Sequence, residues 1–281
     1  MRARRFIQAD VFTSIPTKGN GLAVVVEAED ISDEQMLAFA AWTNLAETTF
    51  LLPPTVQGAD YRLRIFTPSR EMLFAGHPTL GSCAAWLHCG GKPRSPDKIF
   101  QECAIGLVEI DMTGEVPAFV APDTKISAMD DAYRADLCQQ LLLDPEKVVR
   151  SAVLENGPVW NVLELATAED VLAVDATRVS WPDYIGVSLI GPHDAGAECD
   201  FEVRNISPSS GMVEDPITGS LNAALARWMW KEGRLIKSLL IAQGTKMGRV
   251  GRVFVGAPSL GSDRVTIGGH AHVVIDGEVF L

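Results

Sequence analysis

Residues 64–82 read RIFTPSREMLFAGHPTLGS, and residues 204–220 read RNISPSSGMVEDPITGS. Both stretches contain an Arg, a Thr or Ser before Pro-Ser, a Met, a polar residue before Pro, and Gly-Ser. In this alignment His77 corresponds to Asp215, and Gly81-Ser82 corresponds to Gly219-Ser220. The repetition predicts two similar halves that share one strand–turn–helix unit, with a site in the cleft between the two turns.

The apolar stretches after the two repeats are LGSCAAWLHC (80–89) and GSLNAALARWMW (219–230). They predict helices at about 78–89 and 218–231, and a helix that is apolar all round is buried. The expected fold is α+β, with two pseudo-symmetric domains that each wrap a curved, mostly antiparallel sheet or barrel around a central buried helix. A Pro-containing segment places the boundary between domains 1–118 and 119–281, and the last strand is free to return to the first domain.

Local patterns predict the other elements. Acidic residues followed by apolar residues at helical spacing predict a helix at 32–42, with Ser32 as its N-cap. Shorter helical patterns lie at 131–143 and 169–173. Apolar, β-branched runs predict strands at 6–13, 22–26, 48–52, 61–66, 99–102, 107–112, 159–165, 185–190, 202–206, 250–255 and 265–275.

The composition narrows the class of protein. The chain has 281 residues, 47% of them hydrophobic and 21% charged, as in globular proteins with a substantial core. A net charge of -12 argues against a nucleic-acid partner. No apolar stretch is long enough for a membrane span or a signal peptide. Five cysteines without a CxxC motif fit free thiols in a reducing compartment, so a cytoplasmic protein is expected.

The two repeated turns predict an anion site. A helix N-terminus presents unpaired N–H groups and the positive end of the helix dipole, and glycine lets a ligand approach the backbone. Gly76, Gly219 and Ser220 are therefore expected to bind the carboxylate of a small acid. The motifs GxxxxGK[ST], GxGxxG and GxSxG are absent, as is a clustered His/Cys pattern, so neither a cofactor nor a metal is expected.

Three side chains are candidates for acid–base chemistry. His77 and Asp215, at matching positions of the repeat, are expected to face each other across the cleft. Glu47 lies where a helical pattern gives way to an apolar strand. Apolar neighbours disfavour the charged carboxylate and raise its pKa, which suits a group that takes up and returns a proton near neutral pH.

At these residues the chain resembles the PhzF-like proteins, which are related in fold to diaminopimelate epimerase. The resemblance rests on the segments Asp10–Thr13, Gly19-Asn20, Leu22–Val25, Asn44–Phe50, Phe74–Gly81, Glu214–Ser220, Gln243-Gly244 and Gly248-Arg249. It implies a cofactor-free isomerase and a homodimer, in which Glu47 moves a proton between carbons of a small cyclic carboxylic acid. It also implies that His77, Asp215 and Ser220 line the site and that backbone near Gly76 and Gly219 holds the carboxylate.

The departures from the family pattern are Gly21 where Pro is usual and Leu221 where a small residue is usual. Both lie close to the expected site, so they bear on the substrate rather than on the chemistry, and phenazine synthesis does not follow. Epimerases of this fold carry cysteines at the two turns, whereas Cys83 here is expected to be a core residue. The alternatives are a catalytically inactive carboxylate-binding or interaction protein, an amino-acid epimerase or racemase, and a lyase or hydratase.

Overall fold

The computed structural model describes residues 1–178, 186–207 and 213–281. The chain forms two compact units. The N-terminal unit comprises Met1–Val120 and Gly268–Leu281, and the C-terminal unit comprises Ala121–Ile267. The Pro-Ser and Met of the second repeat (208–212) and the first residue of the strand expected at 185–190 lie outside the described residues.

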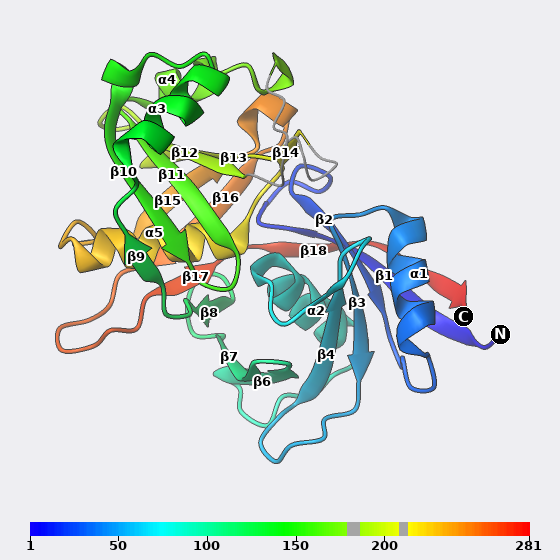
Figure 1. Ribbon diagram of the computed structural model, residues 1–281. Helices are drawn as coiled ribbons and strands as arrows, with labels where there is room; N and C mark the ends of the chain where they lie inside the picture. Colours follow the sequence, from blue (N-terminus) through cyan, green and yellow to red (C-terminus); the bar gives the residue numbers. More distant parts are fainter. Residues whose placement is uncertain (179–185, 208–212) are drawn as a thin grey trace. The chain divides into compact units, whose positions relative to one another are not determined.

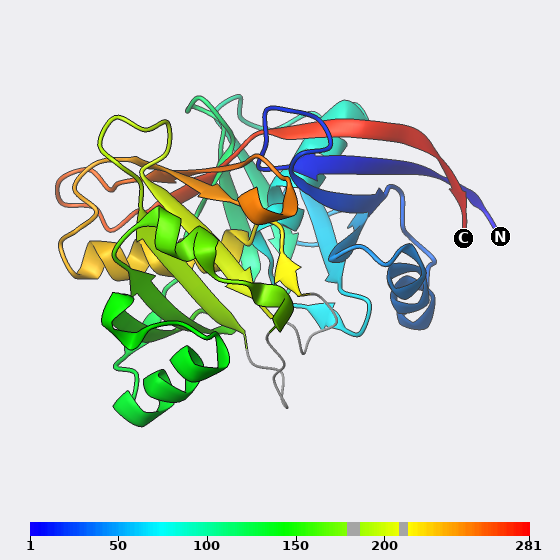
Figure 2. The ribbon, with the colours of Figure 1, turned by 90° about the horizontal axis from the view of Figure 1, so that it is seen from above.

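The N-terminal unit contains one mixed sheet (Figure 1). Its strands are β1 (Ala3–Val11), β2 (Asn20–Val25), β3 (Glu47–Leu52), β4 (Tyr61–Phe66), β5 (Glu71–Met72), β6 (Lys98–Cys103), β7 (Gly106–Asp111), β8 (Ala118–Val120) and β18 (Ala271–Phe280). Strand β1 pairs antiparallel with β2 and β18, and Figure 2 shows β1 beside β18 along most of their length. The pairs β2–β3 and β4–β6 are parallel, and β3–β4, β4–β5, β6–β7 and β7–β8 are antiparallel.

Helix α2 (Gly76–His88) is the core helix of this unit, since most of its residues are buried and it packs against β1, β2, β3 and β18. A Cβ atom on Gly81 would lie 2.6 Å from Cδ2 of Leu22, so this glycine allows α2 to approach the sheet closely. Helix α1 (Asp33–Thr43) packs against β3 and β4. Ser32 is its N-cap as predicted, and Ser32 and Gln35 form a reciprocal capping box.

The C-terminal unit contains β9 (Lys125–Ser127), β10 (Val148–Glu155), β11 (Val159–Leu165), β12 (Val187–Pro192), β13 (Phe201–Ile206), β14 (Glu214–Asp215), β15 (Leu239–Gln243) and β16 (Gly251–Gly256). Strand β17 (Thr266–Gly268) spans the end of this unit at Ile267. Helices α3 (Asp131–Gln140) and α4 (Ala168–Ala173) are short, whereas α5 (Gly219–Lys231) is almost entirely buried and packs against β10 and β16. Short 3₁₀ turns, η1 (Pro145–Lys147), η2 (Ala176–Arg178) and η4 (Thr245–Met247), complete it.

The two units share one pattern of strand pairing. In the C-terminal unit β10–β11, β12–β13, β13–β14 and β15–β16 are antiparallel, and β11–β12 and β13–β15 are parallel. This order reproduces β1–β2, β3–β4, β4–β5, β6–β7, β2–β3 and β4–β6 of the N-terminal unit. Each unit is therefore a mixed sheet with a buried helix after its fifth strand in this order, and the predicted α+β class and internal pseudo-symmetry are confirmed.

The strand registers correct the alignment of the repeat. Phe66 pairs with Glu71 in the β4–β5 hairpin, and Ile206 pairs with Glu214 in the β13–β14 hairpin. The second hairpin loop is therefore longer than the first. From this point α2 begins five residues after Glu71, at Gly76, and α5 begins five residues after Glu214, at Gly219.

His77 thus corresponds to Ser220, because each is the second residue of its buried helix. Asp215 corresponds to Met72 on the short return strand. The prediction that His77 and Asp215 occupy equivalent positions is wrong, and so is the alignment of Gly81 with Gly219. The similar Pro-Ser residues of the loops suggested the incorrect alignment, since the difference in loop length falls between them and the helices.

Within the part of the chain that the structure describes, no helix combines the length and the apolar composition needed to cross a membrane.

Candidate functional site

Glu47 is the first residue of β3. Strand β3 runs parallel to β2, and Glu47 lies opposite Leu22 in the register. The chain leaves α1 through Asn44, which has the left-handed φ of 54° and serves as the C-cap of the helix. The side chain of Glu47 is only 17% exposed. The end of α1 and the start of a buried strand therefore place a carboxylate in a largely enclosed position.

His77 is the second residue of α2 and is 4% exposed. Its Nε2 lies 3.4 Å from Oε2 of Glu47, and its Nδ1 lies 3.5 Å from Nδ2 of Asn20. Burial lowers the pKa of His77 to about 3, since the charged ring would lose its hydration. A carboxylate at 3.4 Å favours the charged ring, but the burial effect is the larger one. His77 is therefore neutral at physiological pH.

Gly76 begins α2, and Ala75 is its N-cap without a side-chain hydrogen bond to the helix. Thr79 turns its hydroxyl back to the carbonyl oxygen of Ala75, at 2.9 Å. The first N–H groups of a helix have no partner within it. The start of α2 can therefore donate backbone hydrogen bonds to an anion beside His77.

Asp215, Gly219 and Ser220 belong to the C-terminal unit. Asp215 ends β14, and its Oδ2 accepts a 2.5 Å hydrogen bond from the hydroxyl of Thr218. Its backbone oxygen accepts a hydrogen bond from Gln243, whose Oε1 in turn accepts from the backbone N–H of Thr218. This network joins the return strand to the start of α5, where Gly219 and Ser220 are the first two helical residues.

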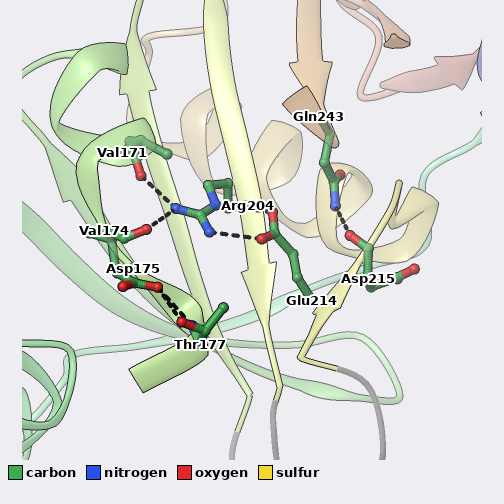
Figure 3. Close-up of polar contacts among 8 residues, drawn as sticks. All are labelled: Val171, Val174, Asp175, Thr177, Arg204, Glu214, Asp215 and Gln243. Carbon is green, nitrogen blue, oxygen red and sulfur yellow. Dashed lines mark hydrogen bonds and ion pairs between the residues drawn. The ribbon is translucent and has the colours of Figure 1, made fainter. Parts of the chain in front are cut away.

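Figure 3 shows that Glu214 and Asp215 direct their side chains to opposite sides of β14, as successive residues of a strand do. Glu214 forms a bidentate ion pair with Arg204, at 2.7 and 3.0 Å, and Arg204 also donates to the carbonyl oxygens of Val171 and Val174 (Figure 3). A cavity of about 600 Å³ adjoins this ion pair. The described residues that line it include none of the six predicted site residues.

The predicted residues thus form two groups. Glu47, Gly76 and His77 lie together in the N-terminal unit, and Asp215, Gly219 and Ser220 lie together in the C-terminal unit. The corrected alignment of the two units shows that the site residues of one unit do not recur in the other. The registers match Glu47 with Gly186, His77 with Ser220, and Asp215 with Met72. Among the described residues, the combination of a carboxylate and an imidazole in this position occurs only in the N-terminal unit.

Two further observations bear on the chemistry of the site. Cys83 is buried inside α2 as expected, and burial raises the pKa of its thiol to about 12, so it is not a reactive thiolate. Among the described residues, no three His, Cys, Asp or Glu side chains lie close enough together to hold a metal ion. Sequence reasoning gave Asn20 no role, although the Gly19-Asn20 segment marked its position.

Comparisons with known proteins show which family the chain is similar to. A family model described as "Phenazine biosynthesis-like protein" matches residues 9–277. The chain is 36% identical to Antisense-enhancing sequence 1 of Schizosaccharomyces pombe, with 100% of both chains covered. It is 32% identical to the trans-2,3-dihydro-3-hydroxyanthranilate isomerase of Pseudomonas aeruginosa, with 99% of each chain covered.

Among solved structures, the PhzF-family phenazine biosynthesis protein of Bacillus anthracis superimposes with a TM-score of 0.84. The alignment covers 100% of both chains at 20% sequence identity. At this level of identity, the likeness shows that the two proteins share a fold.

Proposed function

This chain belongs to the phenazine biosynthesis-like (PhzF) family, and from this premise we propose that it is a cofactor-independent isomerase of a small carboxylic acid. The observation that carries the proposal is the contact between Glu47 and a buried, neutral His77. A carboxylate and a neutral imidazole within 3.4 Å can divide the roles of proton acceptor and hydrogen-bond donor.

In the proposed reaction Glu47 removes a proton from one carbon of the substrate. The electron pair of the broken C–H bond shifts into the conjugated system, and negative charge develops on the substrate carboxylate. The protonated Glu47 then returns the proton to a different carbon. No electrons are gained or lost overall, so the reaction needs no redox partner. Because the pKa of His77 is about 3, the ring does not compete with Glu47 for the proton.

The charge on the substrate carboxylate needs hydrogen-bond donors. We assign this role to the backbone N–H group of Gly76 at the start of α2, and we propose that Gly219 and Ser220 at the start of α5 also bind a carboxylate. A helix N-terminus favours an anion through both its N–H groups and its dipole. Asp215, held by Thr218, is proposed to assist proton handling in the same reaction.

The name of one relative supports a proposal for the substrate class. The name of the Pseudomonas aeruginosa protein describes an isomerase of a dihydro-hydroxyanthranilate, which is a small cyclic carboxylic acid. A cyclic acid with a conjugated ring is the kind of compound in which a proton can move between carbons. We therefore propose a small, cyclic, unsaturated carboxylic acid as the substrate.

Deuterium incorporation tests this proposal. The protein is incubated in D2O with a panel of cyclic unsaturated acids, and each acid is analysed by mass spectrometry and NMR. We expect one or more acids to gain deuterium at carbon and to isomerise without another change of mass. The Glu47→Gln variant is expected to lose this activity by at least about 100-fold, the lower end of the usual contribution of a general base.

Glu34→Gln is the matched control, because Glu34 is an exposed residue in the first turn of α1. Full exchange by Glu47→Gln would exclude Glu47 as the base. Binding of acids without exchange would favour a non-catalytic carboxylate-binding protein, and a product of different mass would favour a lyase or hydratase.

A further inference from the structure

Asn20 is a buried amide beside the Glu47–His77 contact. We infer that Asn20 is a positioning residue that holds His77 as the tautomer protonated on Nε2, with this N–H directed toward Oε2 of Glu47. The consequence for catalysis rests on the proposed function, whereas the tautomer of His77 does not.

The position of Asn20 is set by rigid structure. Asn20 is the first residue of β2, lies opposite Val11 of β1 and is 2% exposed. The preceding residue, Gly19, donates its backbone N–H to Oδ2 of the buried Asp10 at 3.0 Å. A Cβ atom on Gly19 would lie 2.2 Å from the carbonyl oxygen of Val11, so only glycine fits there. The loop that leads into β2 is thereby fixed, and Asn20 with it.

The hydrogen-bonding roles of the Asn20 amide and the Glu47 carboxylate select one tautomer of His77. The Nδ2 of Asn20, 3.5 Å from Nδ1 of His77, is an amide nitrogen and can only donate hydrogen bonds. The facing Nδ1 must then carry the lone pair. A neutral imidazole has one N–H, which must be on Nε2, 3.4 Å from Oε2 of Glu47. Contacts of this length in ligand-free active sites often shorten in the substrate complex.

An N–H on Nε2 of His77 also makes the two carboxylate oxygens of Glu47 different. A proton on Oε2 would point at the N–H of His77, and the two hydrogens would repel each other. The substrate proton is therefore expected on Oε1 during the reaction. The ring stabilises the carboxylate before proton transfer and remains a donor to Oε2 afterwards. Asn20 thus acts on catalysis through His77, without contact with the substrate.

The C-terminal unit gives an internal comparison. The parallel registers of β2–β3 and β11–β12 match Asn20 with Pro158, and His77 corresponds to Ser220. An amide at this point of the strand is therefore not a requirement of the shared fold. It occurs in the unit in which a histidine follows the first glycine of the buried helix.

The test is nitrogen NMR of the protein labelled with ¹⁵N-histidine, recorded at pH 7 without substrate. The chain has five histidines, and the His77→Gln variant identifies the signals of His77. In the unaltered protein we expect a protonated Nε2 and an unprotonated Nδ1. In Asn20→Asp the added carboxylate only accepts hydrogen bonds, so the proton is expected to move to Nδ1. Asn161→Asp is the control, since Asn161 donates to Gly186 in the other unit.

A wild-type His77 protonated on Nδ1 would overturn the inference, and this measurement does not depend on the folding of any Asn20 variant. An unchanged tautomer in folded Asn20→Asp would also overturn it. With an exchanging acid identified, Asn20→Asp is expected to lower kcat at least about tenfold with little change in KM, as for an interaction that acts in the transition state. If no acid exchanges, the proposed function fails while the tautomer result stands.

Discussion

Burial determines the charge of His77 and so its part in the site. Its ring is in contact with Glu47 and Asn20, yet burial lowers its pKa to about 3. A histidine that stays neutral can donate to a carboxylate without taking its proton, whereas a charged ring would form a tight ion pair and weaken Glu47 as a base. The enclosure of His77 by α2 and the sheet is therefore a condition for the proposed proton transfer.

The same shift in pKa predicts an acid-sensitive stability. An unfolded histidine has a pKa of about 6.5, while folded His77 has a pKa of about 3. Between these values the unfolded state binds a proton that the folded state does not, so stability falls as the pH falls from about 6.5 toward 3. At pH 5 the loss from this group is about 2 kcal/mol relative to pH 7, from 1.5 units at about 1.4 kcal/mol each.

Urea denaturation at pH 7 and pH 5 measures this contribution. The His77→Gln variant, which has no titrating ring at this position, is expected to lose about 2 kcal/mol less than the wild type over this interval. The comparison uses the difference between the two pH values for each protein, so a change in stability at pH 7 does not affect it. An equal pH dependence for both proteins would show that His77 is not buried in its neutral form.

At the scale of elements, short sequence patterns predicted the strands and the helix cap that depend on neighbouring residues. The expected strands at 61–66 and 159–165 have the observed bounds of β4 and β11, and Ser32 caps α1. The prediction missed β10 and β15. Strand β15 pairs in parallel with β13, more than 30 residues away (Figure 1), and such distant pairing leaves little trace in the local sequence.

The candidate site, like the strands, was predicted only in part. Side-chain chemistry indicated Glu47 and His77, which the structure brings into contact. The contact with Asn20 depends on how β1, β2 and α2 pack together, and this packing has no sequence signal. The equivalence of His77 and Asp215 failed because the length of a hairpin loop set the true register of the repeat.

The two hairpins carry the same ion pair in different surroundings, and this predicts different effects of one substitution. Arg204 and Glu214 have side chains 2% and 5% exposed, whereas Arg64 and Glu71 are 16% and 38% exposed. Both pairs are bidentate. Breaking a buried pair leaves an uncompensated charge and costs about 3–5 kcal/mol, whereas an exposed pair contributes about 0–1 kcal/mol.

Glu214→Gln and Glu71→Gln are therefore a matched pair of variants. We expect Glu214→Gln to destabilise the C-terminal unit by about 3–5 kcal/mol and Glu71→Gln to change the N-terminal unit by less than about 1 kcal/mol. Urea denaturation gives the loss of stability, and hydrogen exchange in β4 and β13 shows which of the two units loses it. Equal losses in both hairpins would contradict the role assigned to burial.

At the scale of the whole molecule, duplication of the fold has not duplicated the chemistry. Both units have the same strand pairing and a buried helix that begins with glycine. The carboxylate, imidazole and amide of the N-terminal unit (Glu47, His77 and Asn20) correspond to Gly186, Ser220 and Pro158 in the C-terminal unit. Each unit thus has a buried helix that begins with glycine, whereas the Glu47–His77 pair has no counterpart at the matching positions of the C-terminal unit and gives the proposed proton transfer its direction.

The chain order predicts that the last strand is essential to the first unit. Strand β18 pairs with β1 from Val11 to Ala3, and Asp276 accepts two hydrogen bonds from Arg5. A chain that ends at Gly268 lacks β18, so β1 becomes an unpaired edge and α2 loses part of its cover. Hydrogen exchange measured by mass spectrometry is expected to show loss of protection in β1, β2 and α2, while β10, β11 and α5 stay protected. Asp276→Asn, which removes only the exposed contacts of this carboxylate with Arg5 and His88, should leave both units protected. Equal loss of protection in β10 and β11 would show that the two units do not fold as separate cooperative units.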